Sequence, residues 1–167
     1  MRVPRGLVIA TLIVMAVVIQ TTLFGRLRTV VPDLTLLVVI LLALTRTRTE
    51  LILVVAFGSG LIIDLLGSSL LGLRAIVFSC VAYIAIRTRA QAEIGRFATV
   101  IWAGLLTFIG LVLLVVIGTL FGQTNLVSPD IGRRLVLVPV ANMILAAFLS
   151  GLLVRVVDRD KGIFGYT

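Results

Sequence analysis

The stretch Phe97–Leu120, FATVIWAGLLTFIGLVLLVVIGTL, contains no charged residue and is almost entirely apolar. About 20 such residues form a helix long enough to cross the hydrocarbon core of a bilayer, which is roughly 30 Å thick. The run is continuous and lacks the alternation of apolar and polar residues that strands of membrane barrels show. The stretch therefore predicts a transmembrane helix.

Five further apolar blocks surround this stretch, and the segments between them are too short to form a soluble domain. The chain has 167 residues, of which 60% are hydrophobic and 13% are charged. In water this composition would leave large apolar patches exposed. The sequence thus predicts an all-α, polytopic membrane protein with one domain, residues 1–167, built as a bundle of six transmembrane helices. The expected helices span residues 6–24, 30–45, 51–66, 71–86, 97–120 and 135–157.

The formal net charge is +8, which in a soluble protein would suggest binding to nucleic acid. Here the arginines lie between the apolar blocks, where they anchor helices in the lipid headgroups, so we expect the bilayer as a partner and no nucleic acid. If the amino terminus is cytoplasmic, ten of the 15 basic residues fall on the inner side. That excess predicts that both termini are cytoplasmic. The inner residues are Arg2, Arg5, Arg46, Arg48, Arg87, Arg89, Arg96, Arg155, Arg159 and Lys161, and the outer ones are Arg26, Arg28, Arg74, Arg133 and Arg134.

Reactive side chains are scarce in this sequence. There is no histidine, which removes the usual general base and the commonest metal ligand, and the single cysteine, Cys80, lies inside an apolar block. No phosphate-binding loop, pair of carboxylates or histidine-supported nucleophile is evident. We therefore expect neither enzymatic activity nor a cofactor or metal ion.

Asp64 is the acidic residue that stands out, because it lies within an apolar block, in the segment GSGLIIDLLG at 58–67. A carboxylate near the middle of a membrane costs about 2.5–3.5 kcal/mol, and less towards the surface. Asp64 therefore needs a partner, and Arg74 is placed across the short turn between the third and fourth expected helices. Two interpretations remain open: a structural ion pair that locks this helical hairpin, or part of a site for a partner or small ligand.

Small and amide residues inside the blocks indicate close contacts between helices. Gly58 and Gly60 lie on the third expected helix, and Gly72 lies in the turn that follows it. Small residues let helix backbones approach closely in lipid, whether the neighbour belongs to the same chain or to a partner. Gln20 and Asn142 are each expected to hydrogen-bond across the bundle.

Several motifs lie in the first half of the chain: QTTLF at 20–24, PDL at 32–34 with Pro32 in the first turn of its helix, GSGLIIDLL at 58–66 and LGLRA at 71–75. An aromatic residue, Tyr83, follows them before a basic segment. Together these motifs resemble the MreD family of bacterial rod shape-determining proteins. The motifs cover about the first ninety residues, and the number of helices and the chain length extend the resemblance to the rest.

The resemblance implies a non-enzymatic scaffold in the bacterial inner membrane. Members of the family associate with the single-span protein MreC and link filaments of MreB to the peptidoglycan machinery, which includes RodA and its penicillin-binding partner. On this interpretation a partner-binding surface or a structural hairpin is formed by Pro32, Asp33, Gly58, Gly60, Asp64, Gly72 and Arg74.

The family is also similar in fold to the substrate-binding subunits of energy-coupling-factor vitamin transporters, so a transport function is the alternative. Such a subunit needs a polar pocket open to the outside, with aromatic side chains that stack on a ligand. Tyr83 and Trp102 are both expected towards the inner side of the membrane, which disfavours this alternative.

Overall fold

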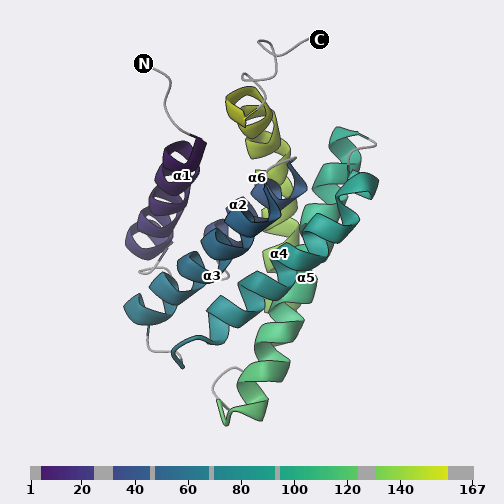
Figure 1. Ribbon diagram of the computed structural model, residues 1–167. Coiled ribbons are helices and arrows are strands. Elements are labelled where there is room, and N and C mark those ends of the chain that lie inside the picture. The colour runs from purple at the N-terminus through teal and green to yellow at the C-terminus, as the bar shows by residue number, and fades with distance from the viewer. Residues whose placement is uncertain are drawn as a thin grey trace, which may run out of the picture.

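The structure is a computed structural model, and it describes residues 5–24, 32–45, 48–67, 70–92, 95–123 and 131–157. These residues form a bundle of six α-helices, as the sequence predicts (Figure 1). The start of α1 and the end of α6 lie at the same end of the bundle (Figure 1). The helices are α1 (Arg5–Ile19), α2 (Leu34–Leu44), α3 (Thr49–Leu66), α4 (Leu73–Ala92), α5 (Arg96–Leu120) and α6 (Ile131–Val157), and a π-helical stretch, η1 (Gln20–Phe24), continues α1.

The shortest helix, α2, forms the centre of the bundle. Every residue from Thr35 to Leu44 is buried, and each of the other five helices packs against α2. A helix that is apolar on all sides is stable only when it is surrounded in this way. The core therefore consists of α2 and the inward faces of its neighbours.

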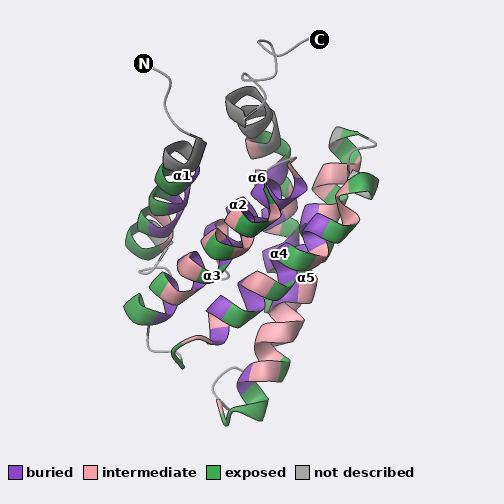
Figure 2. Cartoon of the chain, in the orientation of Figure 1, coloured by how far each residue is buried: buried purple, intermediate pink, exposed green. Residues whose placement is uncertain are grey.

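The outward faces of the bundle are strongly apolar, and Figure 2 shows exposed residues along the outer sides of the helices. Phe97 is 88% exposed and Phe148 is 76% exposed. Among the described residues, three helical stretches are long and apolar enough to cross a membrane: Thr49–Leu66, Phe97–Leu120 and Ile131–Leu149. Two shorter apolar stretches, Ile9–Thr22 and Leu34–Leu44, accompany them. These features are those of a multi-pass membrane protein, whose apolar exterior faces lipid.

Two helix boundaries differ from the sequence prediction for identifiable reasons. The second helix begins at Leu34 rather than at residue 30, so Pro32 lies before the helix and not in its first turn. Asp33 caps α2 instead, because its side chain accepts a hydrogen bond from the backbone N–H of Leu36. The fourth helix continues to Ala92, beyond the predicted end at 86, because its last turns contain alanine, arginine and glutamine, which are good helix formers.

Two further elements depart from the prediction. The sixth helix begins at Ile131, a turn before the predicted start at 135. The first helix does not keep α-helical geometry as far as residue 24, since its last five residues form η1. The sequence context of Cys80, inside an apolar block, predicts a small packing residue, and this prediction is wrong, because Cys80 is exposed on α4.

Candidate functional site

Helices α3 and α4 form a hairpin in which the two backbones touch. A Cβ atom placed on Gly60 would lie 2.6 Å from the Cα and the backbone nitrogen of Ala75. Only glycine fits at this position. In the connecting turn Gly72 has a φ of 90°, a backbone conformation that glycine adopts without strain. Together these two glycines bring the end of α3 against the start of α4.

Asp64 lies at this junction and is 2% exposed. Its Oδ2 atom accepts a hydrogen bond of 2.9 Å from the backbone N–H of Arg74, in the first turn of α4. The Nε atom of the Arg74 side chain lies 3.9 Å from Oδ1. The structure thus brings together the two residues that the sequence indicated as partners, and Asp64 also acts as an N-terminal cap for α4.

Arg74 contacts a second buried carboxylate, which the sequence did not link to it. Its Nη1 atom lies 3.5 Å from Oδ2 of Asp33, the residue that caps α2. The other carboxylate oxygen, Oδ1, accepts the backbone N–H of Leu36 at 3.1 Å. One guanidinium therefore links the end of α3 to the start of α2.

Gln20 joins the end of α1 to the same cluster. Its Nε2 atom donates to Oδ1 of Asp33 at 3.2 Å. Its Oε1 atom accepts from the backbone N–H of Thr35 at 2.9 Å and from the Thr35 hydroxyl at 3.2 Å. The NH2 group of the amide is thus bonded to Asp33, the cap of α2, and its carbonyl oxygen to Thr35, in the first turn of that helix.

Asn142 adds α5 and α6 to the cluster and is completely buried. Its Nδ2 atom donates to the backbone carbonyl of Asp33 at 3.3 Å and to the hydroxyl of Thr107 at 3.1 Å. Thr107 in turn donates to the carbonyl of Ala103, at 2.7 Å. We call the set Gln20, Asp33, Thr35, Asp64, Arg74, Thr107 and Asn142 the polar hub, because it contains residues from α1–η1 and from all five other helices or their caps.

The charges in the polar hub are close to balanced without any added ion. The two carboxylates face one guanidinium, and each carboxylate also accepts an N–H from the first turn of a helix, α2 for Asp33 and α4 for Asp64. A helix amino terminus carries roughly half a positive charge, so two of them supply about the one unit that Arg74 leaves uncompensated. Backbone donors and Arg74 therefore supply the hydrogen bonds and positive charge that face the two carboxylates.

The other predicted site residues lie around the hub and do not enter it. Pro32 precedes Asp33 and has no N–H, so it leaves the start of α2 to the capping carboxylate. Gly58 lies on α3 but a Cβ atom there would meet nothing within 4 Å, so it faces away from α4. The glycines at 58 and 60, which look equivalent in the sequence, thus have opposite surroundings.

The arrangement is suited to holding helices together. Within the described ranges, no three acidic or cysteine side chains gather as ligands for a metal ion. The oxygen atoms of Asp33 and Gln20 accept hydrogen bonds from within the chain. Sequence reasoning missed Thr35, Thr107 and the contact between Asp33 and Arg74. Each polar hub residue could nonetheless be recognised as a polar residue within or beside an apolar block.

Comparison with known proteins relates the chain to one described family. The model of the family described as rod shape-determining protein MreD matches residues 2–157 of the chain. Neither a search of curated proteins nor a search of solved structures found a match. The similarity in fold to energy-coupling-factor transporter subunits therefore stays a prediction.

Proposed function

Because the chain belongs to the MreD family of rod shape-determining proteins, we propose that it is the membrane scaffold that binds MreC in the cell-elongation machinery. Membership in this non-enzymatic family gives the chain a role in determining rod cell shape. In the proposed complex, the chain helps to couple MreB filaments to peptidoglycan synthesis by RodA and its penicillin-binding partner. The chain is then one integral membrane domain, residues 1–167, with six crossings of the inner membrane and both termini in the cytoplasm.

The polar hub supports the proposal of a scaffold function, because its polar groups point into the bundle. Its hydrogen bonds and ion pairs join helices of the same chain, while the outward faces of the described helices are apolar. Lateral association between helices in lipid depends on close packing of such faces. A partner that crosses the membrane once can bind by laying its helix along one of them.

We place the contact with MreC on the outer side of α3, which we call the α3 outer face and define as Val54, Gly58, Ile62 and Leu65. These residues follow one another at helical spacing, so they share one side of the helix. Val54 is 70% exposed and Leu65 is 64% exposed. Gly58, with open space beside it, provides the shallow point at which a second helix backbone can approach.

Within this proposal the other predicted site residues act indirectly. The backbone of α4 fills the space beside Gly60. Asp64 and Arg74 are bonded to one another, and Arg74 also contacts Asp33. They fix the position of α3, and so of the α3 outer face, relative to the rest of the bundle. The hairpin thus serves as the support of the contact surface.

The test is co-purification of MreC with the tagged chain from native membranes after mild detergent extraction. Gly58→Leu fills the shallow point at a position where a Cβ atom meets nothing within 4 Å, so the yield of the chain should be normal and the recovered MreC should fall several-fold. The matched control is Gly132→Leu on α6, where a Cβ atom also meets nothing within 4 Å. Unchanged recovery of MreC with Gly58→Leu, or an equal loss with the control, would exclude the α3 outer face.

A further inference from the structure

One side of α4 carries a line of exposed residues that ends at an arginine. Ile76, Cys80, Tyr83 and Arg87 follow one another at helical spacing, so they share this side of the helix. Ile76 is 45% exposed and Tyr83 is 47% exposed, and Cys80 and Arg87 are exposed as well. We call these four residues the α4 outer stripe. It places a cation at the end of an otherwise apolar, lipid-facing surface.

The guanidinium of Arg87 is held against Tyr83. Its Nε and Nη2 atoms donate to the Tyr83 hydroxyl at 3.1 Å and 2.9 Å. Its central carbon lies 5.2 Å from the centre of the Tyr83 ring, where the negative face of the ring attracts a cation. The hydroxyl and the ring thus fix the position of the guanidinium before any ligand arrives.

This arrangement leaves donors unused. A guanidinium has five N–H groups, and a tyrosine hydroxyl can donate its own hydrogen while its oxygen accepts. Within the described part of the chain, the only acceptor for the Arg87 guanidinium is the Tyr83 hydroxyl. Arg74, near the other end of α4, faces two carboxylates, whereas no carboxylate among the described residues pairs with Arg87. Arg87 and Tyr83 therefore present positive charge and N–H and O–H groups to an outside acceptor.

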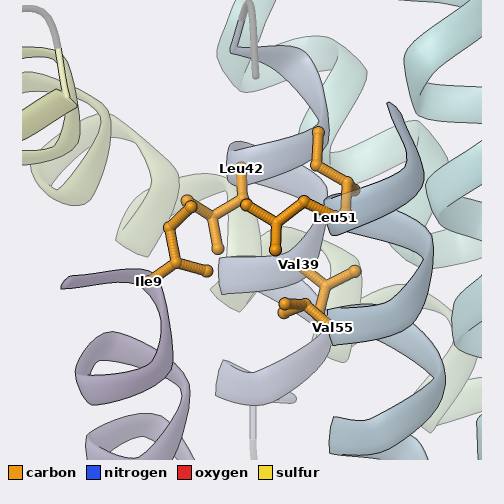
Figure 3. A pocket seen from close by; sticks show the side chains of 6 residues that line it. Ile9, Val39, Leu42, Leu51 and Val55 are labelled. Carbon is orange, nitrogen blue, oxygen red and sulfur yellow. The ribbon is translucent and has the colours of Figure 1, made fainter. Parts of the chain in front are cut away.

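The gap between α1, α2 and α3 offers no comparable groups. It is too narrow to admit a water molecule, and the side chains around it in Figure 3 are aliphatic. Such a lining has nothing with which to distinguish one polar headgroup from another. The lining residues are Ile9, Val39, Leu42, Leu51, Ile52 and Val55.

We propose that Arg87 and Tyr83 form a binding site for the headgroup of an anionic phospholipid. The phosphate diester accepts hydrogen bonds from the unused N–H groups of Arg87 and from the hydroxyl of Tyr83. The planar fork of a guanidinium binds two oxygen atoms of one phosphate, which a single ammonium group cannot do. The acyl chains lie along Cys80 and Ile76, where the small side chain of Cys80 leaves room between its larger neighbours.

The charge of the site favours an anionic lipid over a zwitterionic one. Phosphatidylglycerol has a net negative charge, whereas in phosphatidylcholine the choline group cancels the charge of the phosphate. A basic residue close to the membrane surface attracts anionic lipids for this reason. The site lies on α4 and not on the α3 outer face, so it does not depend on the proposed contact with MreC.

The native cysteine provides a reporter for the test, because Cys80 is the single cysteine of the chain and lies one turn from Tyr83 on the α4 outer stripe. The full chain, labelled at Cys80 with bimane, is reconstituted into phosphatidylcholine vesicles. Either phosphatidylglycerol or phosphatidylcholine with brominated acyl chains is then added at the same mole fraction. Bromine quenches the bimane on contact, so brominated phosphatidylglycerol should quench several-fold more strongly at low mole fraction. Equal quenching by the two lipids would overturn the proposal.

Three variants separate a built site from general attraction by charge. Arg87→Gln should abolish the preference for phosphatidylglycerol, and Tyr83→Phe, which keeps the charge and the ring, should reduce it. The matched control is Arg89→Gln, which removes the same charge from a half-buried position two residues further along α4 and should keep the preference. Equal quenching of each variant by brominated phosphatidylcholine shows that the label keeps its surroundings. An undiminished preference in Arg87→Gln, or an equal loss in Arg89→Gln, would overturn the site, and an undiminished preference in Tyr83→Phe would remove the hydroxyl from it.

Discussion

Gly60 lies where the backbones of α3 and α4 touch, and its lack of a side chain is a condition of that contact. A methyl group there would lie 2.6 Å from two backbone atoms of Ala75, and a backbone inside a helix cannot rotate away as a side chain can. Gly60→Ala should therefore force the hairpin apart and destabilise the chain by about 1–3 kcal/mol, as overpacking does in other cores. Thermal unfolding of the purified chain in detergent measures this loss.

Gly58 is the control for that substitution, since it lies on the same helix two residues away. A Cβ atom at Gly58 meets nothing within 4 Å, and alanine is favoured over glycine inside a helix by up to about 1 kcal/mol. Gly58→Ala should leave the unfolding temperature unchanged or raise it. Equal effects of the two substitutions would show that the hairpin is not packed as closely as the structure has it.

At the scale of elements, Asn142 connects α6 to both α2 and α5. Asn142→Ala removes two interhelical hydrogen bonds at a fully buried position and leaves the Asp33 carbonyl and the Thr107 hydroxyl without this donor. We expect a loss of about 1–3 kcal/mol in the free energy of unfolding. Thr107→Val preserves the shape of its side chain and removes one of the two bonds, so it should cost less. Denaturant titration in mixed micelles compares the two variants, and a larger loss for Thr107→Val would contradict the role given to Asn142.

The helices themselves could be located from the sequence because each contains a long and mostly apolar run. Their ends could not be placed as well, because the ends depend on single contacts. Where α2 begins is decided by the hydrogen bond from Leu36 to the Asp33 side chain, and the π-helical geometry of η1 follows no apolar pattern. Arg87 and Arg89 look like a loop in the sequence but lie on α4, because arginine is a good helix former.

The candidate site was predictable only where its partners are close along the chain. Asp64 and Arg74 are ten residues apart across a short turn, so their pairing could be inferred. Asn142 lies 109 residues from its partner Asp33, and nothing local in the sequence specifies that contact. The polar hub as a whole therefore needed the three-dimensional arrangement of all six helices.

At the scale of the whole molecule, the distribution of basic residues predicts that both termini lie in the cytoplasm. In the Cys80→Ser background, Gln123→Cys lies just after α5, on the predicted outer side, and Ala90→Cys lies near the end of α4, on the predicted inner side. A membrane-impermeant thiol reagent added to intact spheroplasts should label Gln123→Cys. It should reach Ala90→Cys only after permeabilisation, because the segments predicted to be cytoplasmic hold ten of the 15 basic residues. The reverse pattern would place both termini outside.

The brevity of α2 has a consequence for how the protein is made. Its 11 residues measure about 16 Å along the axis, roughly half the thickness of the hydrocarbon core. An apolar run of about 10–14 residues is more typical of a helix buried inside a protein than of an independent membrane span. It is nonetheless the helix on which all the others converge. We therefore expect the insertion of α2 into the membrane to depend on the longer helices that surround it.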